Sequence, residues 1–135
     1  MNKIKIAFAG SILLMIILVA KYFQKRNSLY ANSKFTTGEY INYNVGVKTG
    51  GGLKFSYLID GEAYEDICCQ HLPTKCERYL MGNEDALRQY TFPVAYDATD
   101  PSNAELLVVQ SQYDRYELDV PDEIEEIIRI ISTCE

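Results

Sequence analysis

Three of the four cysteines and the only histidine of the chain lie within the eleven residues 66–76. A structural zinc site would need four nitrogen or sulfur ligands, but the spacing lacks the closely paired ligands that zinc knuckles use. A thiol redox centre normally has two residues between its cysteines, whereas two of these cysteines are adjacent. The candidate ligands and thiols are Cys68, Cys69, His71, Cys76 and Cys134.

Disulfide bonds are the chemistry that we expect of these cysteines. Four cysteines allow three pairings, and a bond between the adjacent Cys68 and Cys69 should be strained, because neighbouring residues in a strand point to opposite faces. We therefore expect Cys76 to pair with one of the two and Cys134 with the other. The long loop to Cys134 would contribute up to ~4 kcal/mol on the chain-entropy model. In a cytosolic domain all four would remain thiols.

The other polar residues suggest no catalytic arrangement. A serine-histidine-acid set would have to recruit His71, and the acids lie on patterned solvent faces where no carboxylate pair stands out. The glycines at 50–52 are not followed by the lysine and hydroxyl residue of a phosphate-binding loop. Asp97 and Asp100 lack the further ligands of a calcium loop. We predict that the protein is not an enzyme and holds no metal or cofactor.

Charge divides the chain into two parts. Residues 1–38 carry six cations and no acid, whereas residues 39–135 carry nineteen acids and seven cations, giving +6 and −12 within a total of −6. This pattern is typical of a basic segment near a membrane joined to an acidic domain. Since binding to nucleic acid depends on clustered Lys and Arg, we expect no nucleic-acid partner for the acidic part.

The N-terminal segment contains an uncharged run, residues 6–20, between Lys5 and Lys21. As a helix these fifteen residues would extend ~22 Å, less than the ~30 Å of a bilayer core. Flanking apolar residues lengthen the run, and the two lysines can reach the headgroups. We therefore expect residues 1–23 to be a transmembrane signal-anchor that contacts the lipid bilayer through residues 4–23.

The topology follows from the layout of this segment and from the cysteine content. Leu18 occupies a position where signal peptidase requires a small residue, so we expect the leader to stay attached, with a cleaved signal peptide as the alternative. The positive charges on the two sides of the run are almost balanced and give little direction. A short basic start before an apolar run and four cysteines favour an oxidising compartment. We place the C-terminal domain outside the cytoplasm, on the cytoplasmic membrane.

After the anchor, the pattern predicts a polar tether at 24–37 and a soluble β-rich domain at 38–135. Alternating apolar residues predict strands at 40–48, 53–59 and 62–68. Asp60 and Gly61 predict a type I′ turn between the last two strands. In that register Tyr57 faces Tyr64 and Leu58 faces Ala63.

The second half of the domain combines short helices with two more strands. We expect helices at 74–82 and from Asn83, strands at 91–97 and 104–110, and a helical turn at 111–114. Pro93 places its strand at an edge or a strand start. From Pro121 an amphipathic helix carries four isoleucines at 124, 127, 128 and 131. The fold class is α+β: an N-terminal transmembrane helix, a small antiparallel β-sheet or barrel-like domain, and a C-terminal amphipathic helix.

The run FPVAYDATDPSNAELLV, residues 92–108, follows a tyrosine-rich hairpin and resembles a family of small bacterial membrane-anchored proteins with a domain of unknown function. Its pattern is Val-x-Tyr-Asp followed by Asp-Pro, a small residue and leucine. The matching positions are Val94, Tyr96, Asp97, Asp100, Pro101, Ser102 and Leu106. The resemblance covers roughly residues 38–108 and implies a β-rich domain attached to a membrane span, with no attributed catalytic residues. The cysteine cluster is not part of the pattern.

Together these features predict a single-pass membrane protein whose extracytoplasmic domain is a protein-binding or scaffolding module with an unidentified protein partner. The eleven tyrosines, among them Tyr40, Tyr43, Tyr57 and Tyr64, could supply a contact surface or could pack against the sheet. The alternative function is a metal- or thiol-dependent activity centred on the cysteine cluster.

Overall fold

The computed structural model describes residues 2–44, 52–69 and 74–133, with side chains from Gly10 onward. The end of the predicted strand 40–48 after Asn44, the glycines at 50 and 51, His71 and Cys134 lie outside the described residues.

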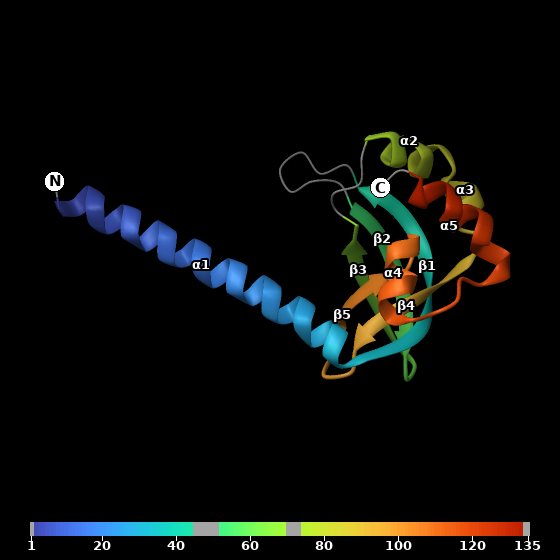
Figure 1. The fold of residues 1–135 in the computed structure, drawn as a ribbon, viewed down its shortest axis with the longest axis horizontal. Helices are drawn as coiled ribbons and strands as arrows, with labels where there is room; N and C mark the ends of the chain where they lie inside the picture. The colour runs from blue at the N-terminus through green and yellow to red at the C-terminus, as the bar shows by residue number, and fades with distance from the viewer. Residues whose placement is uncertain (1, 45–51, 70–73, 134–135) are drawn as a thin grey trace.

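Helix α1, Asn2–Ala31, projects away from the folded domain (Figure 1). From residue 12 to residue 23 its large apolar side chains are exposed by 43–67%. Because eight of them are consecutive, they cover every side of the helix. Within the described part of the chain, no helix meets the length and hydropathy criteria for a membrane span. Those exposed side chains are Ile12, Leu13, Leu14, Met15, Ile16, Ile17, Leu18, Val19, Tyr22 and Phe23.

The segment 24–37 does not have the form of a tether. Its residues continue α1 without interruption to Ala31, and the chain enters the first strand at Ser33. Leu29, only 5% exposed, already packs in the domain. Helix and domain are therefore connected through ordered structure along the whole junction.

Five antiparallel strands form one sheet in the order β3-β2-β1-β4-β5. They are β1 Ser33–Asn44, β2 Gly52–Ile59, β3 Glu62–Cys68, β4 Thr91–Asp97 and β5 Asp100–Leu106. The expected strands 53–59, 62–68 and 91–97 are confirmed, whereas β5 begins and ends four residues before the expected 104–110. The reason is that a tight turn after Asp97 returns the chain at once, so that Asp100 already pairs with Asp97.

The β2–β3 hairpin has the predicted turn and register. Asp60 and Gly61 both have positive φ, +51° and +85°, as a type I′ turn requires. Tyr57 pairs with Tyr64 and Leu58 with Ala63. The rings of the tyrosine pair stack with centroids 5.5 Å apart, which stabilises this register.

Of the two positions expected for the strand of Pro93, an edge or a strand start, the edge is wrong, because β4 lies between β1 and β5. Pro93 is nevertheless near the start of β4, and the pairing with β5 begins only at Val94. The missing N–H of the proline therefore interrupts no bond of that ladder.

The sheet curves until its two edge strands, β3 and β5, approach each other (Figure 1). The amide of Ala104 donates to the Asp66 carboxylate at 3.4 Å, and the Cys68 thiol donates to the Leu106 carbonyl at 3.8 Å. We call this line between β3 and β5 the seam. The fold is thus α+β with a nearly barrel-like antiparallel sheet, as the sequence indicated.

Short helices cover the remaining core. They are α2 Thr74–Gly82, α3 Glu84–Leu87, α4 Gln110–Tyr116, the 3-10 turn η1 Asp122–Ile124 and α5 Glu125–Ser132. The C-terminal helix is confirmed, although its first turn is 3-10. Ile124, Ile128 and Ile131 are 1–2% exposed, so the isoleucine stripe packs in the core of the domain.

Candidate binding pocket at the helix–domain junction

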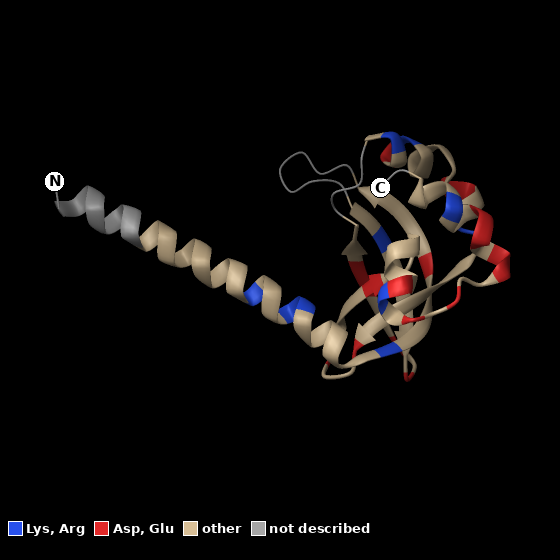
Figure 2. Ribbon diagram, viewed as in Figure 1, with Lys and Arg blue, Asp and Glu red and all other residues tan. Residues whose placement is uncertain are grey.

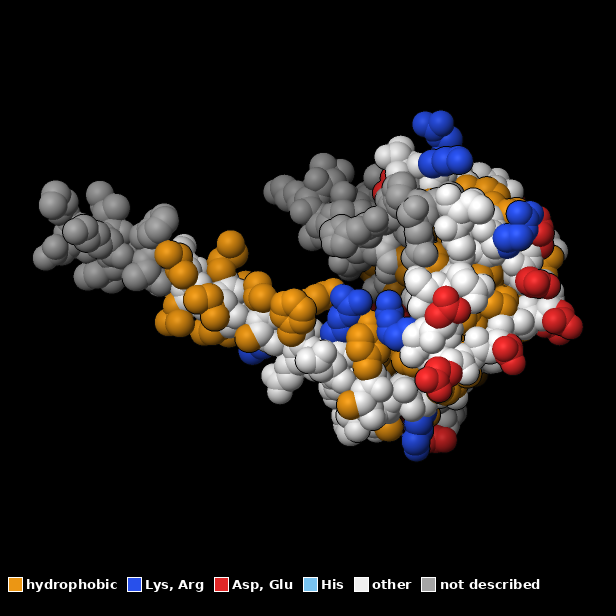
Figure 3. Space-filling view, in the orientation of Figure 1, with side chains coloured by type: hydrophobic (Ala, Val, Ile, Leu, Met, Phe, Trp, Pro, Cys, Tyr) orange, Lys and Arg blue, Asp and Glu red, His pale blue; other side chains and the backbone are white. Residues whose placement is uncertain are grey.

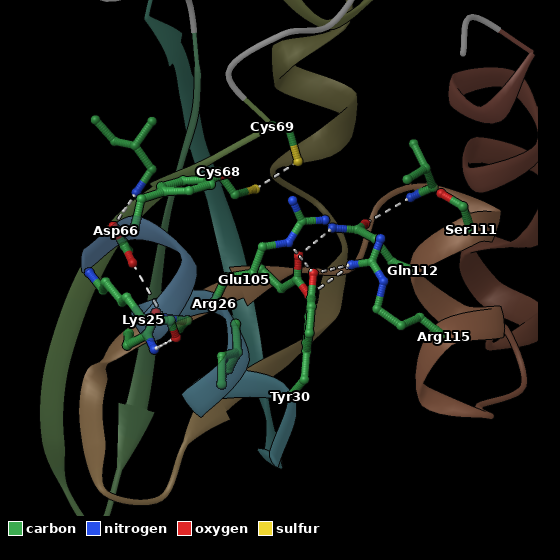
Figure 4. Close-up of a pocket in the computed structure, with 16 residues that line it drawn as sticks. Lys25, Arg26, Tyr30, Asp66, Cys68, Cys69, Glu105, Ser111, Gln112 and Arg115 are labelled. Carbon is green, nitrogen blue, oxygen red and sulfur yellow. Dashed lines mark hydrogen bonds and ion pairs between the residues drawn. The ribbon is translucent and has the colours of Figure 1, made fainter. Parts of the chain in front are cut away.

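A cavity of about 730 Å³ lies where α1 joins the domain. Its walls come from residues 22–30 of α1, 66–69 at the end of β3, 103–105 of β5 and 109–115 around α4. Since β3 and β5 are the two edge strands, the cavity lies over the seam, with α1 beside it (Figure 4). We call it the junction pocket.

Two arginines meet at one tyrosine in this pocket. Nε of Arg26 donates to the Tyr30 hydroxyl at 2.7 Å, and a guanidinium nitrogen of Arg115 donates to the same oxygen at 2.8 Å. Both guanidinium groups also lie over the Tyr30 ring, 5.5 and 5.0 Å from its centroid. The contact joins α1 to α4, and cation–π attraction adds to its hydrogen bonds.

Glu105 is the acid that faces this pair. Its carboxylate accepts from Gln112 at 3.2 Å, from Arg115 at 3.5 Å and from the Tyr116 hydroxyl. Burial, and next the hydrogen bond to Glu105, raise the pKa of Tyr116 above its ordinary value. Tyr116 therefore stays protonated and donates to Glu105. The ion pair of Arg115 with Glu105 is thus bordered by two uncharged donors, Gln112 and Tyr116.

Asp66 provides a second acid on the opposite wall. Burial raises the pKa of its carboxyl, while the amides of Ile67 and Ala104 and the charge of Lys25 act in the opposite direction. The amide of Ile67 donates to it at 2.8 Å. The pocket thus presents both signs of charge, with Lys25 on the α1 side and Asp66 on the β3 side (Figure 4).

A buried carboxylate fixes α1 beside this pocket. Asp97, 1% exposed, accepts from the Ser28 hydroxyl at 2.5 Å, from the amide and hydroxyl of Thr99 at 2.8 and 2.7 Å, and from Asn103 at 3.4 Å. The Asn103 amide also donates to the Lys25 carbonyl at 2.8 Å. We call Ser28, Asp97, Thr99 and Asn103 the Asp97 clamp.

The clamp keeps its carboxylate charged. Burial alone would raise the pKa of Asp97, but the hydrogen bonds from Ser28, Thr99 and Asn103 outweigh burial and hold it at about 2. The hydrogen bonds of Asp97 are therefore not confined to its own turn. Asp97 does bond the nearby Thr99, but it also bonds a helix 69 residues earlier.

The cysteines do not have the arrangement expected from strand geometry. Strand β3 ends at Cys68, and Cys69 turns away with a φ of +59°. The Sγ atoms of Cys68 and Cys69 consequently lie on the same side, 2.8 Å apart, and both residues line the junction pocket. The premise that they point to opposite faces is wrong.

Cys76 lies away from this pair. It is buried on α2, where its Sγ donates to the Ile131 carbonyl of α5 at 3.9 Å. Cys68, Cys69 and Cys76 are free thiols in the structure, so the expected bond from Cys76 to Cys68 or Cys69 is not present. Among the described residues, no three His, Cys, Asp or Glu side chains group as a metal site, while His71 and Cys134 lie outside them.

Three of the four tyrosines named as a contact surface are in the core. Tyr40, Tyr43 and Tyr57 are 3–6% exposed, and only Tyr64 is half-buried. Their hydroxyls bond Glu84, Glu77 and the Pro101 carbonyl respectively. For Tyr40, Tyr43 and Tyr57, packing in the core is the interpretation that the structure confirms.

Chemically, the junction pocket can bind a ligand that carries charged or hydrogen-bonding groups. The sequence contained a weak signal for it: basic residues directly after the apolar run and acids in β3 and β5. Comparison of the chain with protein-family models, with curated proteins and with solved structures gave no match.

Proposed function

We propose that the protein is a single-pass membrane protein whose extracytoplasmic domain binds a protein partner through the junction pocket. Residues 4–23 enter the cytoplasmic membrane, and residues 24–31 carry the helix into the domain. The observation that carries the proposal is the apolar surface of α1 from Ile12 to Phe23, exposed on all sides of a helix that projects from the fold.

The exposed surface is costly in water. Each Å² of apolar area in water costs about 25 cal/mol relative to burial, and here the cost is repeated at ten large side chains. A helix that is apolar all round is typical of a buried core helix or a membrane span. The described part of the domain leaves these side chains largely exposed, and a bilayer would remove the cost.

The length of α1 supports insertion when the flanks are included. Its thirty residues extend about 45 Å, so the helix can cross a core of ~30 Å and still reach the domain. Lys21, Lys25 and Arg26 follow the apolar run, where cations can contact lipid headgroups.

The charge distribution supports an orientation of the domain in which α5 lies far from the bilayer. Figures 2 and 3 show cations where α1 meets the domain and many of the acids on the far side, over α5 and its neighbours. An anionic membrane surface attracts the first group and repels the second. The acidic end of the domain, at α5 and its neighbours, therefore points away from the bilayer. The junction pocket lies next to the bilayer.

A protein partner in the junction pocket would contact the hydrogen-bonding side chains that lie along the seam between β3 and β5. The lining combines acids with Arg26, Arg115 and Tyr30, and arginine and tyrosine are enriched at protein interfaces. An exposed apolar residue at its border, Ile67, adds contact area.

Membrane attachment is tested with two arginines in the apolar run, Leu14→Arg and Ile17→Arg together. We expect the wild-type chain to stay in the membrane fraction after alkaline carbonate extraction and the variant to be released. Glu123→Arg, which changes charge on the exposed acidic end, is the control and should stay. A reporter fused to the C-terminus that is active only outside the cytoplasm tests the topology; activity only inside would overturn it.

The binding site is tested by photo-crosslinking in intact cells. A photoreactive amino acid replaces Ile67 at the pocket, and in a control chain it replaces Met81, an exposed apolar residue of α2. We expect a specific protein adduct from position 67 and none from position 81. Adducts with lipid alone, or equal protein adducts at both positions, would contradict the proposal.

A further inference from the structure

The strained end of β3 places two thiols next to each other in the wall of the junction pocket. We propose that Cys68 and Cys69 form a reversible disulfide with each other, by exchange with a small-molecule or protein disulfide that enters the pocket. The inference does not depend on the membrane anchor or on the protein partner proposed above.

The geometry carries the proposal. In a regular strand, adjacent side chains point to opposite faces, and a bond between them would require the backbone to distort. Here the distortion is present before any bond forms, because Cys69 has a φ of +59°, which is uncommon for a residue other than glycine. Figure 4 shows the two sulfurs directed at each other, 2.8 Å apart. A bond of about 2.05 Å requires them to approach by less than 1 Å.

The two thiols differ in access, which assigns their roles. Cys69 is half-buried and borders the pocket, whereas Cys68 is 8% exposed and its thiol donates to the Leu106 carbonyl across the seam. Burial, followed by the contact with Cys69, raises the pKa of the Cys68 thiol well above its ordinary value. Cys69 is therefore the attacking thiol and Cys68 the resolving thiol.

The exchange balances in two steps. The Cys69 thiolate attacks one sulfur of the incoming disulfide, forms a mixed disulfide and releases the first thiolate of the oxidant. Cys68 then loses its proton to that thiolate, attacks Sγ of Cys69 and releases the second thiolate, which takes the proton first lost by Cys69. Two thiols are oxidised, and one external disulfide is reduced to two thiols.

Oxidation would change the pocket as well as the cysteines. Cys68 would lose its S–H donor, and with it the contact to Leu106 that joins β3 to β5. The bond would also fix the turn at Cys69 at the end of the strand. Both changes occur in the wall where a ligand would lie.

The test uses the full-length chain in detergent, equilibrated in mixtures of reduced and oxidised glutathione and then alkylated. Trypsin cleavage after Lys54 and Lys75 gives a peptide, residues 55–75, that contains Cys68 and Cys69 and no other cysteine. We expect this peptide to change from doubly alkylated to unalkylated and two hydrogens lighter as the glutathione becomes oxidised, and to return with dithiothreitol. A peptide that stays doubly alkylated, or that is linked to Cys76 or Cys134, would overturn the proposal.

Three variants test the assignment of roles. Cys68→Ala should stop at a mixed disulfide with one glutathione on Cys69, whereas Cys69→Ser should react much more slowly than wild type. Cys76→Ala is the matched control and should leave the transition of peptide 55–75 unchanged. Equal rates for Cys68→Ala and Cys69→Ser would contradict the roles, and the wild-type peptide still tests the bond itself if a variant fails to fold.

Discussion

The two halves of α1 belong to one unbroken helix but have opposite surroundings. From Ile12 to Phe23 the large side chains other than Lys21 are apolar and exposed in the described structure, whereas from Lys25 to Ala31 the helix is held by hydrogen bonds and by the buried Leu29. The apolar half alone would make an anchor with a domain attached loosely. The polar half, joined to Asp97, gives the domain a fixed direction relative to the helix.

The largest expected effect is the loss of the Asp97 clamp. Asp97→Ala removes the acceptor for Ser28, Thr99 and Asn103, and hydrogen bonds to a buried charge contribute about 1.5–3 kcal/mol each. Because bonds that share one acceptor are not additive, we expect a loss of about 3–5 kcal/mol in the free energy of unfolding and faster hydrogen exchange at 24–31. Asp100→Ala, in the same motif but exposed, is the control and should cost less than about 1 kcal/mol. Equal losses of stability in both variants would contradict the claim that the buried bonds of Asp97 hold residues 24–31 of α1 to the domain.

A matched pair of leucines compares the two halves directly. Leu29→Ala empties a buried position and should lower the free energy of unfolding of the domain by about 2–3 kcal/mol. Leu14→Ala removes a side chain that is 59% exposed and should change the value by less than about 0.5 kcal/mol. Denaturant titration in the same detergent measures both. If Leu14→Ala destabilised the domain as much, the apolar half would have a partner within the fold.

Acid should weaken the junction through Asp97. Its pKa in the folded chain is about 2, below the value of about 3.9 for an unperturbed aspartate, so the unfolded state binds the proton more readily. The stabilisation is complete above pH ~4 and is lost as the pH falls towards 2. Unfolding followed by circular dichroism between pH 5 and 2 should show this loss, and Asp97→Asn should reduce it. An unchanged pH profile in Asp97→Asn would assign the acid sensitivity to other groups.

The smallest expected effect concerns the arginine pair. Tyr30→Phe removes the hydroxyl that accepts from Arg26 and Arg115 but keeps the ring beneath their guanidinium groups. We expect a loss below about 1 kcal/mol in the free energy of unfolding, because these arginines are exposed to solvent. Tyr90→Phe, which removes a tyrosine hydroxyl outside the junction pocket, is the control and should have no measurable effect. A larger loss for Tyr30→Phe would make this contact a principal joint of the helix.

The features that the sequence predicted well depend on neighbouring residues. The Asp60-Gly61 turn, the pairing of Tyr57 with Tyr64 and the helix 74–82 each follow from a few consecutive side chains. The continuation of α1 through 24–31 was missed because these polar residues have no period of their own. Their helical form is stabilised by Asp97 and Asn103, which are 69 and 78 residues away from their partners in the chain.

The junction pocket was missed for a related reason. It is formed by the two edge strands, and although a barrel-like sheet was expected, the sequence pattern does not indicate which strands are the edges. The arrangement of the cysteines depended on a single torsion angle, at Cys69, where the regular alternation of a strand ends. Alternation predicted the side-chain directions within β3 and failed one residue beyond it.

The continuity of α1 has a mechanical consequence. Because the helix runs from Asn2 to Ala31 without a break and its last turns are bonded to the domain, a swivel of the domain relative to the helix would require these bonds to break. A tilt or rotation of the helix axis would turn the whole domain through the same angle. If two copies paired through their helices, the separation and angle between their acidic ends would therefore be set by the helix pairing.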